Sequence, residues 1–270
     1  RTHLGSISEP PSSLKRPYHF VPFQDDTRVA IAGDPEARRS TVSIYLLDQP
    51  DPFDTEEHYR DLLVRALFAS VINERVREIT RDADAPISSG GIGWNRFLRG
   101  TEIAVASAVV RNDAVVDALE TIARELVRAE RHGILEAELD RARKRLLESI
   151  DEARVNYETR HAASLADELV RHWTEGEAAP GIDEEHRLYH RYVPSIGIDE
   201  VEAIASEFTQ KEHRVLLAGL RTDEDGNLPD GSPIPSEAEL IQTLERVENE
   251  TIEPWSEAAL PDSLVEEPPE

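Results

Sequence analysis

Two histidines lie four residues apart in the second half of the chain, at the spacing that places two side chains on one face of a helix. His186 and His190 could hold a divalent metal ion together, because imidazole is a common ligand of transition metals. The sequence shows no third ligand beside them, and the neighbouring residues Glu184, Glu185 and Arg187 are typical of a solvated surface. We therefore interpret the pair as surface histidines and predict no metal site in this chain.

The motifs that carry hydrolytic chemistry are missing. Helical zinc sites of peptidases need two histidines one turn apart and an adjacent glutamate, in the order HExxH or HxxEH, and neither order occurs. The nearest approaches are Glu185-His186, with Ile182 in the first histidine position, and Glu57-His58, with Asp54 in that position. The chain also has no cysteine, no G-x-S-x-G elbow and no phosphate-binding glycine loop. We predict no catalytic residue.

Residues at the end of one predicted helix and in one predicted strand are candidates for binding instead. Arg75, Arg77 and Arg81 end a predicted helix, where positive charge is favourable, and that structural reason suffices for at least one of them. The others form either a solvated cluster or a site for a carbonyl or carboxylate of a substrate. Trp94 is either a half-buried sheet aromatic or a surface for a peptide. If the chain binds a ligand by itself, we expect the site at Arg77, Arg81, Trp94 and Arg96.

The charge of the chain excludes several kinds of partner. Fifty-five acidic against 30 basic residues give the 270-residue chain a formal net charge of -25 and a pI near 4.7. Such a surface repels phosphate backbones and anionic membranes, so we expect no nucleic acid partner. The acids are scattered, which favours a solvated surface over a site for a cationic substrate. No apolar run approaches the roughly 20 residues that cross a bilayer, so we expect no membrane span.

Hydrophobic periodicity predicts the elements that must position these residues. The Pro- and Ser-rich segment 1–24 is an expected lead-in, 25–222 an α+β domain, and 223–270 a turn-rich segment with a helix and a linker to a following half. Strands are expected at 29–32, 41–47, 87–98, 102–110 and 214–219, and helices at 54–81, 113–132, 135–150, 158–173, 184–192, 199–208 and from 236 onward. This order predicts a largely antiparallel or mixed sheet with helices on one face.

Local signals refine these elements. Asp54 with Glu57 suggests a capping box, and Asp113 is expected to cap the second helix. Residues 87–98 and 102–110 read as a hairpin with its turn at 99–100, in which Ile103, Val105, Ser107 and Val109 share a face. The glycine run 90–93 lies inside a strand pattern and indicates a bulge or a close backbone approach.

Five stretches, taken together, resemble the pitrilysin/insulinase family of zinc metallopeptidases. They are DPEARRSTVSIYL at 34–46, LFASVINERVREITRDADAPI at 67–87, GILEAELDRARKRLLE at 133–148, SIGIDEVEAIASEF at 195–208 and PIPSEAELIQTLERVENETIEPW at 233–255. The chain is similar to the non-catalytic second domain of one half of the tandem-repeat bacterial members. The resemblance implies a fold like that of the mitochondrial processing peptidase, and a clam-shell enzyme whose chamber adds the substrate peptide as a strand.

The resemblance also implies where the chemistry lies. Zinc is expected in a catalytic domain upstream of Arg1, and the partners are expected to be the neighbouring peptidase domains and the peptide substrate. The chain begins with Arg1 rather than Met, so we expect it to be a piece of a longer protein. The family suggests the periplasm or cell envelope as its location.

One departure from the family pattern concerns substrate contact. Active relatives have an arginine followed seven residues later by a tyrosine, and the ungapped match places Arg81 and Ser88 at these positions. The missing tyrosine favours a scaffolding role. The expected function is thus that of a non-catalytic domain supporting a zinc metalloendopeptidase and lining its peptide chamber. The alternative is a free-standing, catalytically inactive scaffold or assembly subunit with the same fold.

Overall fold

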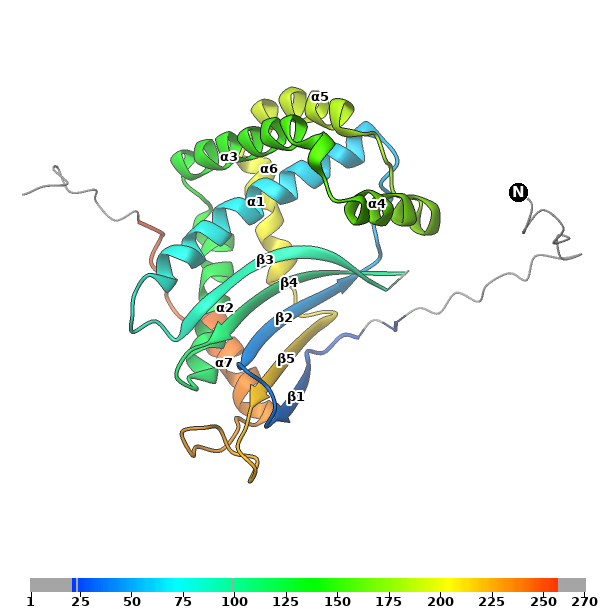
Figure 1. Cartoon of the computed structure of the whole chain (residues 1–270). Coiled ribbons are helices and arrows are strands. Elements are labelled where there is room, and N and C mark those ends of the chain that lie inside the picture. Colours follow the sequence, from blue (N-terminus) through cyan, green and yellow to red (C-terminus); the bar gives the residue numbers. More distant parts are fainter. Residues whose placement is uncertain (1–20, 23, 99, 257–270) are drawn as a thin grey trace, which may run out of the picture.

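The computed structural model describes residues 21–22, 24–98 and 100–256 (Figure 1). Most of the expected lead-in, Arg99 of the expected turn and the end of the expected tail lie outside the described residues. The strands are β1 (Arg28–Asp34), β2 (Thr41–Asp48), β3 (Ile87–Leu98), β4 (Thr101–Val110) and β5 (Arg214–Arg221). The helices are α1 (Glu56–Thr80), α2 (Val115–His132), α3 (Glu136–Val155), α4 (Ala162–Glu175), α5 (Ile182–Tyr192), α6 (Ile198–Ala203) and α7 (Glu237–Asn249). Short 3₁₀ turns lie at Tyr157–Thr159, Val193–Ser195 and Ile204–Phe208.

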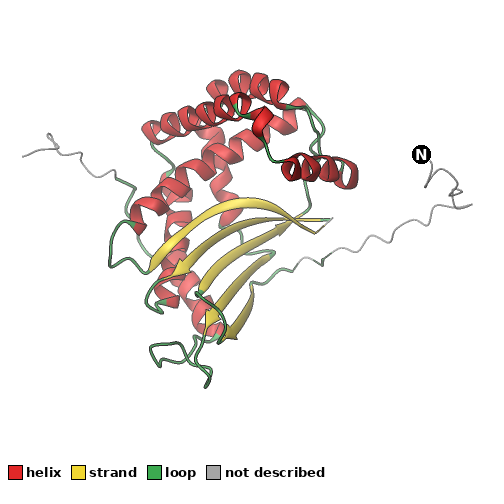
Figure 2. Ribbon diagram, in the orientation of Figure 1, coloured by secondary structure: helices red, strands yellow, loops and turns green. Residues whose placement is uncertain are grey.

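The strands form one mixed sheet in the order β1-β5-β2-β4-β3. β1 and β5 are parallel, and the other neighbouring pairs are antiparallel. Figure 2 shows the helices gathered on one side of this sheet. The predicted α+β architecture, largely antiparallel with helices on one face, is therefore confirmed. None of the described helices combines the length and apolarity needed to cross a membrane.

Alternation along the strands decides which residues enter the core. On β4, Ala104, Ala106 and Ala108 are buried against the helices, and their small side chains leave room for close packing. The residues that we expected to share a face do alternate with these alanines, so they lie on the opposite face of the sheet. Val105 and Val109 are accordingly only half-buried.

The predicted start of α1 was wrong in its detail. Thr55, not Asp54, is the N-cap, because its hydroxyl accepts a hydrogen bond from the backbone N of His58 at 3.2 Å. The carboxylate of Asp54 instead contacts His58 Nδ1 at 3.0 Å.

Two other helix starts were also predicted wrongly. Asn112 and Asp113 have φ angles of 52° and 57°, so both residues form a left-handed turn, and α2 begins after Ala114 without a side-chain cap. The helix predicted at 158–173 begins only at Ala162, because the backbone of Arg160 is extended at a ψ of 142° and ends the preceding 3₁₀ turn.

The glycine run in β3 marks close backbone approaches. β3 is an edge strand, and the side-chain amide of Asn73 on α1 occupies its free edge: Asn73 Oδ1 accepts from Ile92 N at 2.6 Å, and Asn73 Nδ2 donates to Ile92 O at 3.2 Å. A Cβ on Gly91 would lie 2.5 Å from Asn73 Oδ1, and one on Gly90 would lie 2.7 Å from the backbone O of Ser107. The register irregularities of β3 lie elsewhere, near its two ends.

Replacing Gly91 with alanine should therefore destabilise the fold by about 1–3 kcal/mol, since the methyl group displaces the Asn73 amide. Gly93, two residues along the same strand, has no heavy atom within 4 Å of its added Cβ. Urea unfolding should accordingly show a lower midpoint for Gly91→Ala and no loss for Gly93→Ala. Equal midpoints for the two variants would contradict the proposed role of Asn73.

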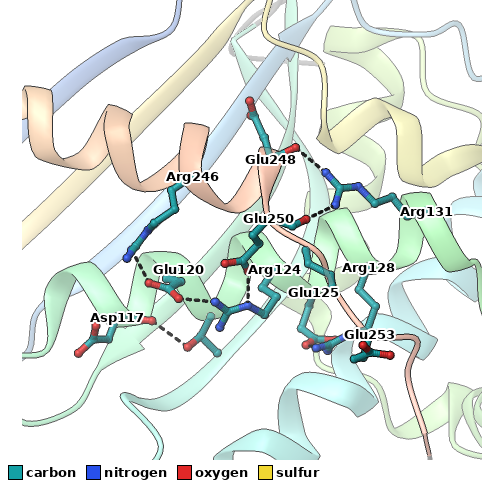
Figure 3. A network of polar contacts seen from close by, with 12 residues as sticks. Asp117, Glu120, Arg124, Glu125, Arg128, Arg131, Arg246, Glu248, Glu250 and Glu253 are labelled. Atoms are coloured by element: carbon teal, nitrogen blue, oxygen red, sulfur yellow. Dashed lines mark hydrogen bonds and ion pairs between the residues drawn. The ribbon is translucent and has the colours of Figure 1, made fainter.

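The segment after α7 is held against α2 by arginines (Figure 3). Arg131 Nη1 donates to the backbone O of Glu250 at 2.6 Å, and Arg124 Nε contacts the carboxylate of Glu250 at 2.7 Å. Arg128 Nε donates to the backbone O of Glu253 at 2.9 Å. α7 and this segment thus pack directly on the preceding part of the chain, and the boundary that we placed at 222/223 stays a prediction.

Candidate functional site

A pocket of about 760 Å³ lies between α1, the β3–β4 hairpin and α4. Phe53, Leu62 and Trp94 are the large apolar side chains that line it. The charged and titratable residues around it come from five segments: Asp51, His58, Asp61, Arg65, Arg96, Glu102, Arg171, Glu175 and Glu177. The pocket therefore combines large apolar surfaces with a polar rim, which is the usual composition of a binding site.

Trp94 forms one wall of this pocket and is anchored on the core side. Its ring meets Phe208 edge to face, with centroids 5.2 Å apart and an interplanar angle of 74°. Its indole Nε1 donates to Glu207 Oε2 at 3.1 Å, and the guanidinium of Arg65 lies 5.6 Å from the ring centroid. Trp94 is thus a half-buried sheet aromatic that also faces the pocket, and its contact with a peptide stays a prediction.

Arg65 organises the charges beneath the pocket. Its guanidinium lies 3.1 Å from Asp51, 3.1 Å from Glu102 and 3.7 Å from Glu207. Burial raises the pKa of Glu207, while Arg65 and the Trp94 hydrogen bond act in the opposite direction. The charged side chains beneath the pocket are therefore held in ion pairs and do not provide a free reactive group.

The rim carries a surplus of negative charge. Arg96 on β3 binds Glu175 on α4, with Nη1 3.0 Å from Oε2, and Arg171 binds Glu177 at 2.9 Å. Five carboxylates and three arginines line the pocket, so two negative charges are not balanced by arginine. An apolar or cationic side chain of a ligand therefore suits this pocket better than a carboxylate.

The structure separates the four residues that we expected to form a binding site. Trp94 and Arg96 line the pocket together. Arg77 and Arg81 lie at the other end of α1, where they contact Glu74 at 2.8 and 3.9 Å. Arg81 is 12 residues beyond Ala69, the last α1 residue of the pocket, which is roughly 18 Å along the helix axis.

Sequence reasoning missed the contribution of α4 to the pocket. Arg171, Glu175 and Glu177 carry no motif, and they reach the pocket only because the chain returns to the hairpin after α3. It also missed Asp151, which lies on α3 beside His186 and His190 of α5. No signal in the sequence links residues 35 and 39 positions apart on two helices.

Comparison with known proteins gives this site a context. No family model matches the sequence. A protein of Arabidopsis thaliana named "Zinc protease PQQL-like" is 25% identical over 272 residues, covering 100% of this chain and 25% of that protein. The first half of the periplasmic protease PqqL from Escherichia coli matches with a TM-score of 0.78 and 14% identity, over 91% of this chain and 52% of that one. A predicted insulinase family protease from Yersinia pestis matches with a TM-score of 0.73 and 12% identity, over 90% and 50% of the two chains.

The chain is similar to zinc proteases of the pitrilysin/insulinase family. The resemblance stated from the five sequence stretches is thereby confirmed. Among its pitrilysin/insulinase relatives, the chain spans about a quarter of the curated Arabidopsis protein and about half of the Escherichia coli half-protein. The pocket therefore lies in a domain whose fold also occurs in larger proteases.

Proposed function

We propose that this chain is the non-catalytic second domain of one half of a tandem zinc metalloendopeptidase. It supports the catalytic domain of the same parent chain and lines part of the peptide chamber. The zinc ion of the reaction belongs to the catalytic domain, where an HxxEH motif would hold it and activate water. This chain supplies surfaces rather than chemistry, in keeping with the absence of that motif from its sequence.

The exposed apolar surface at the α4 end of the molecule carries this proposal. α4 buries none of its residues, although it carries several large apolar side chains. Among the residues that the structure describes, nine large apolar side chains are exposed, and six of them lie on α4, at the tip of the β3–β4 hairpin or on the facing side of α1: Leu62, Phe97, Leu98, Leu169, Val170 and Trp173. These elements meet at one end of the molecule (Figure 1). We call this set the α4 surface.

A neighbouring domain is the occupant that this surface favours. Trp173 is 86% exposed, and clustered exposure of large apolar side chains is typical of interaction sites. The Arabidopsis relative is about four times as long as this chain, which supports a partner domain within the same polypeptide as the occupant. Tryptophan is also the residue type most enriched among the dominant contacts of interfaces.

The pocket lies directly beside the α4 surface and gives the domain its part in the peptide chamber. Asn73 occupies the outer hydrogen-bonding groups of Ile92, so a peptide cannot pair with β3 at that residue. The part of β3 that follows Ile92 and leads to Trp94 and Arg96 borders the pocket and is the part where an added strand would reach it. We infer that this part of β3 and the pocket hold apolar or cationic residues of the peptide substrate.

The same comparisons support a cellular location. The Escherichia coli protein PqqL is described as periplasmic. We propose the periplasm or cell envelope for the protein that contains this chain.

The test is a substitution on the α4 surface in the complete gene product. Trp173→Glu should leave the folding stability of the 270-residue chain unchanged, because the side chain is exposed, yet lower peptide hydrolysis by the complete protein at least about tenfold. Ile234→Glu is the matched control, since Ile234 is an exposed apolar residue in the turn-rich segment after β5. Equal hydrolysis by the Trp173→Glu variant, the Ile234→Glu variant and the unmodified protein would overturn the proposed docking role.

A further inference from the structure

A second cluster of chemically capable side chains lies on the far side of the helical layer from the sheet. Asp151 on α3 faces His186 and His190 on α5, and one ligand atom from each residue lies within 4.8 Å of the other two. His186 Nε2 is 2.9 Å and His190 Nε2 is 2.8 Å from the same oxygen, Asp151 Oδ1. The two imidazole rings have centroids 4.4 Å apart. Both rings thus aim their Nε2 atoms at one point beside one carboxylate.

The separations of these ligand atoms are close to those in a metal site. Zinc binds imidazole nitrogen and carboxylate oxygen at about 2.0–2.2 Å, so neighbouring ligand atoms of a tetrahedral site are roughly 3.3 Å apart. The observed separations of 2.9 and 2.8 Å are shorter by about half an ångström. A small side-chain rotation on two rigid helices would open the space for the ion.

The donor set selects the class of ion. Two imidazoles and one carboxylate suit zinc and other divalent transition metals, whereas calcium and magnesium prefer oxygen ligands alone. His186 is 23% exposed, His190 43% and Asp151 52%, so an ion can enter from solvent and keep water in its remaining positions. The local structure is anchored below the cluster, because Leu188 of α5 is buried and Ile150 of α3 is buried.

We propose that Asp151, His186 and His190 bind a divalent transition-metal ion, such as Zn²⁺, which ties α5 to α3. This site is separate from the zinc of the proposed catalytic domain and does not depend on the proposed function. It acts on the stability of the helical layer rather than on hydrolysis. A bound ion stabilises the folded chain by mass action, since the three ligands come together only on folding.

Titration of the metal-free 270-residue chain with Co²⁺, without a histidine tag, tests the site. We expect one Co²⁺ per chain with visible d–d absorption bands, displacement by Zn²⁺, and a rise in the midpoint of thermal unfolding when Zn²⁺ is present. His186→Ala and His190→Ala should each weaken binding at least about tenfold. Asp151→Asn keeps the shape of the ligand but removes its charge, and should also weaken binding while preserving the fold.

His58→Ala provides the matched control. His58 also contacts an aspartate through a ring nitrogen, with Nδ1 3.0 Å from Asp54 Oδ1. Within the described part of the chain, this pair has no third ligand close enough to form a metal site. This variant should bind Co²⁺ as the unmodified chain does. Absence of stoichiometric Co²⁺ binding, or binding that survives both the His186→Ala and His190→Ala substitutions, would overturn the proposal.

Discussion

Replacing Glu138 with alanine should destabilise the folded chain by about 3–5 kcal/mol, because it leaves the charge of Arg75 buried without its partner. The guanidinium of Arg75 is 1% exposed and binds Glu138 through two contacts, Nε to Oε1 at 2.7 Å and Nη2 to Oε2 at 2.6 Å. Glu138 Oε2 also accepts a hydrogen bond from the backbone N of Leu135 at 2.8 Å and so closes the first turn of α3. The substitution removes all three contacts together.

The remaining surroundings of Arg75 add to this expectation. Its Nη2 also donates to the backbone O of Gly133 at 3.3 Å, and its guanidinium lies 5.2 Å from the ring centroid of Trp255. Arg75 thus joins α1, the α2–α3 turn and the segment after α7. Loss of its carboxylate partner weakens the connection between these parts of the chain.

Urea unfolding followed by circular dichroism measures the effect. Glu148→Ala on the same helix is the control, because Glu148 is 64% exposed and forms a long surface ion pair with Lys144 at 3.8 Å. Its unfolding midpoint should equal that of the unmodified chain. The double substitution Arg75→Met with Glu138→Leu should recover most of the lost stability, since an apolar pair of similar volume often replaces a buried ion pair without loss. A Glu138→Ala midpoint equal to that of Glu148→Ala would contradict this account.

Phe208→Ala should cost about 3–5 kcal/mol of folding stability, as expected for the loss of a buried aromatic ring. Phe208 is 2% exposed and connects two elements that bound the pocket. Its ring centroid lies 6.1 Å from that of Phe68 on α1 and 5.2 Å from that of Trp94 on β3. The cavity left by the ring would also remove the support behind Trp94.

Two measurements distinguish this effect from a general loss of an aromatic residue. Trp173→Ala removes a larger ring that is 86% exposed, and should change stability by no more than about 0.5 kcal/mol. Below the unfolding transition, Phe208→Ala should also change the tryptophan fluorescence, because Trp94 loses its neighbour. If Phe208→Ala and Trp173→Ala unfold at the same urea concentration, Phe208 does not hold α1 and β3 together.

The sequence predicted the elements because their signals are local. In α1, Leu63, Leu67 and Val71 recur at helical spacing, and all three are buried. The helix expected from residue 236 onward does begin there, because Ser236 caps α7 by accepting a hydrogen bond from Glu239 N at 3.2 Å. The start of α1 was predicted less well, because the adjacent polar residues Asp54 and Thr55 compete for the cap position. The start of α2 was missed because Asn112 and Asp113 form a left-handed turn ahead of the helix.

The candidate site depends on contacts that no local pattern reveals. Arg65 is paired with Glu102, 37 residues later, and Arg96 with Glu175, 79 residues later. The sequence therefore pointed to Trp94 and Arg96 but could not show that α4 completes the pocket around them. The burial of Arg75 is hidden for the same reason, since Glu138 follows it by 63 residues.

The mass of the complete gene product in the source cells tests the central claim most directly. Immunoblotting with an antibody against this chain, followed by intact-mass measurement of the purified product, gives that mass. We predict a species several times larger than 30.3 kDa that contains an HxxEH motif upstream of Arg1. A product near 30.3 kDa would contradict the account and identify a free-standing subunit without a catalytic domain of its own.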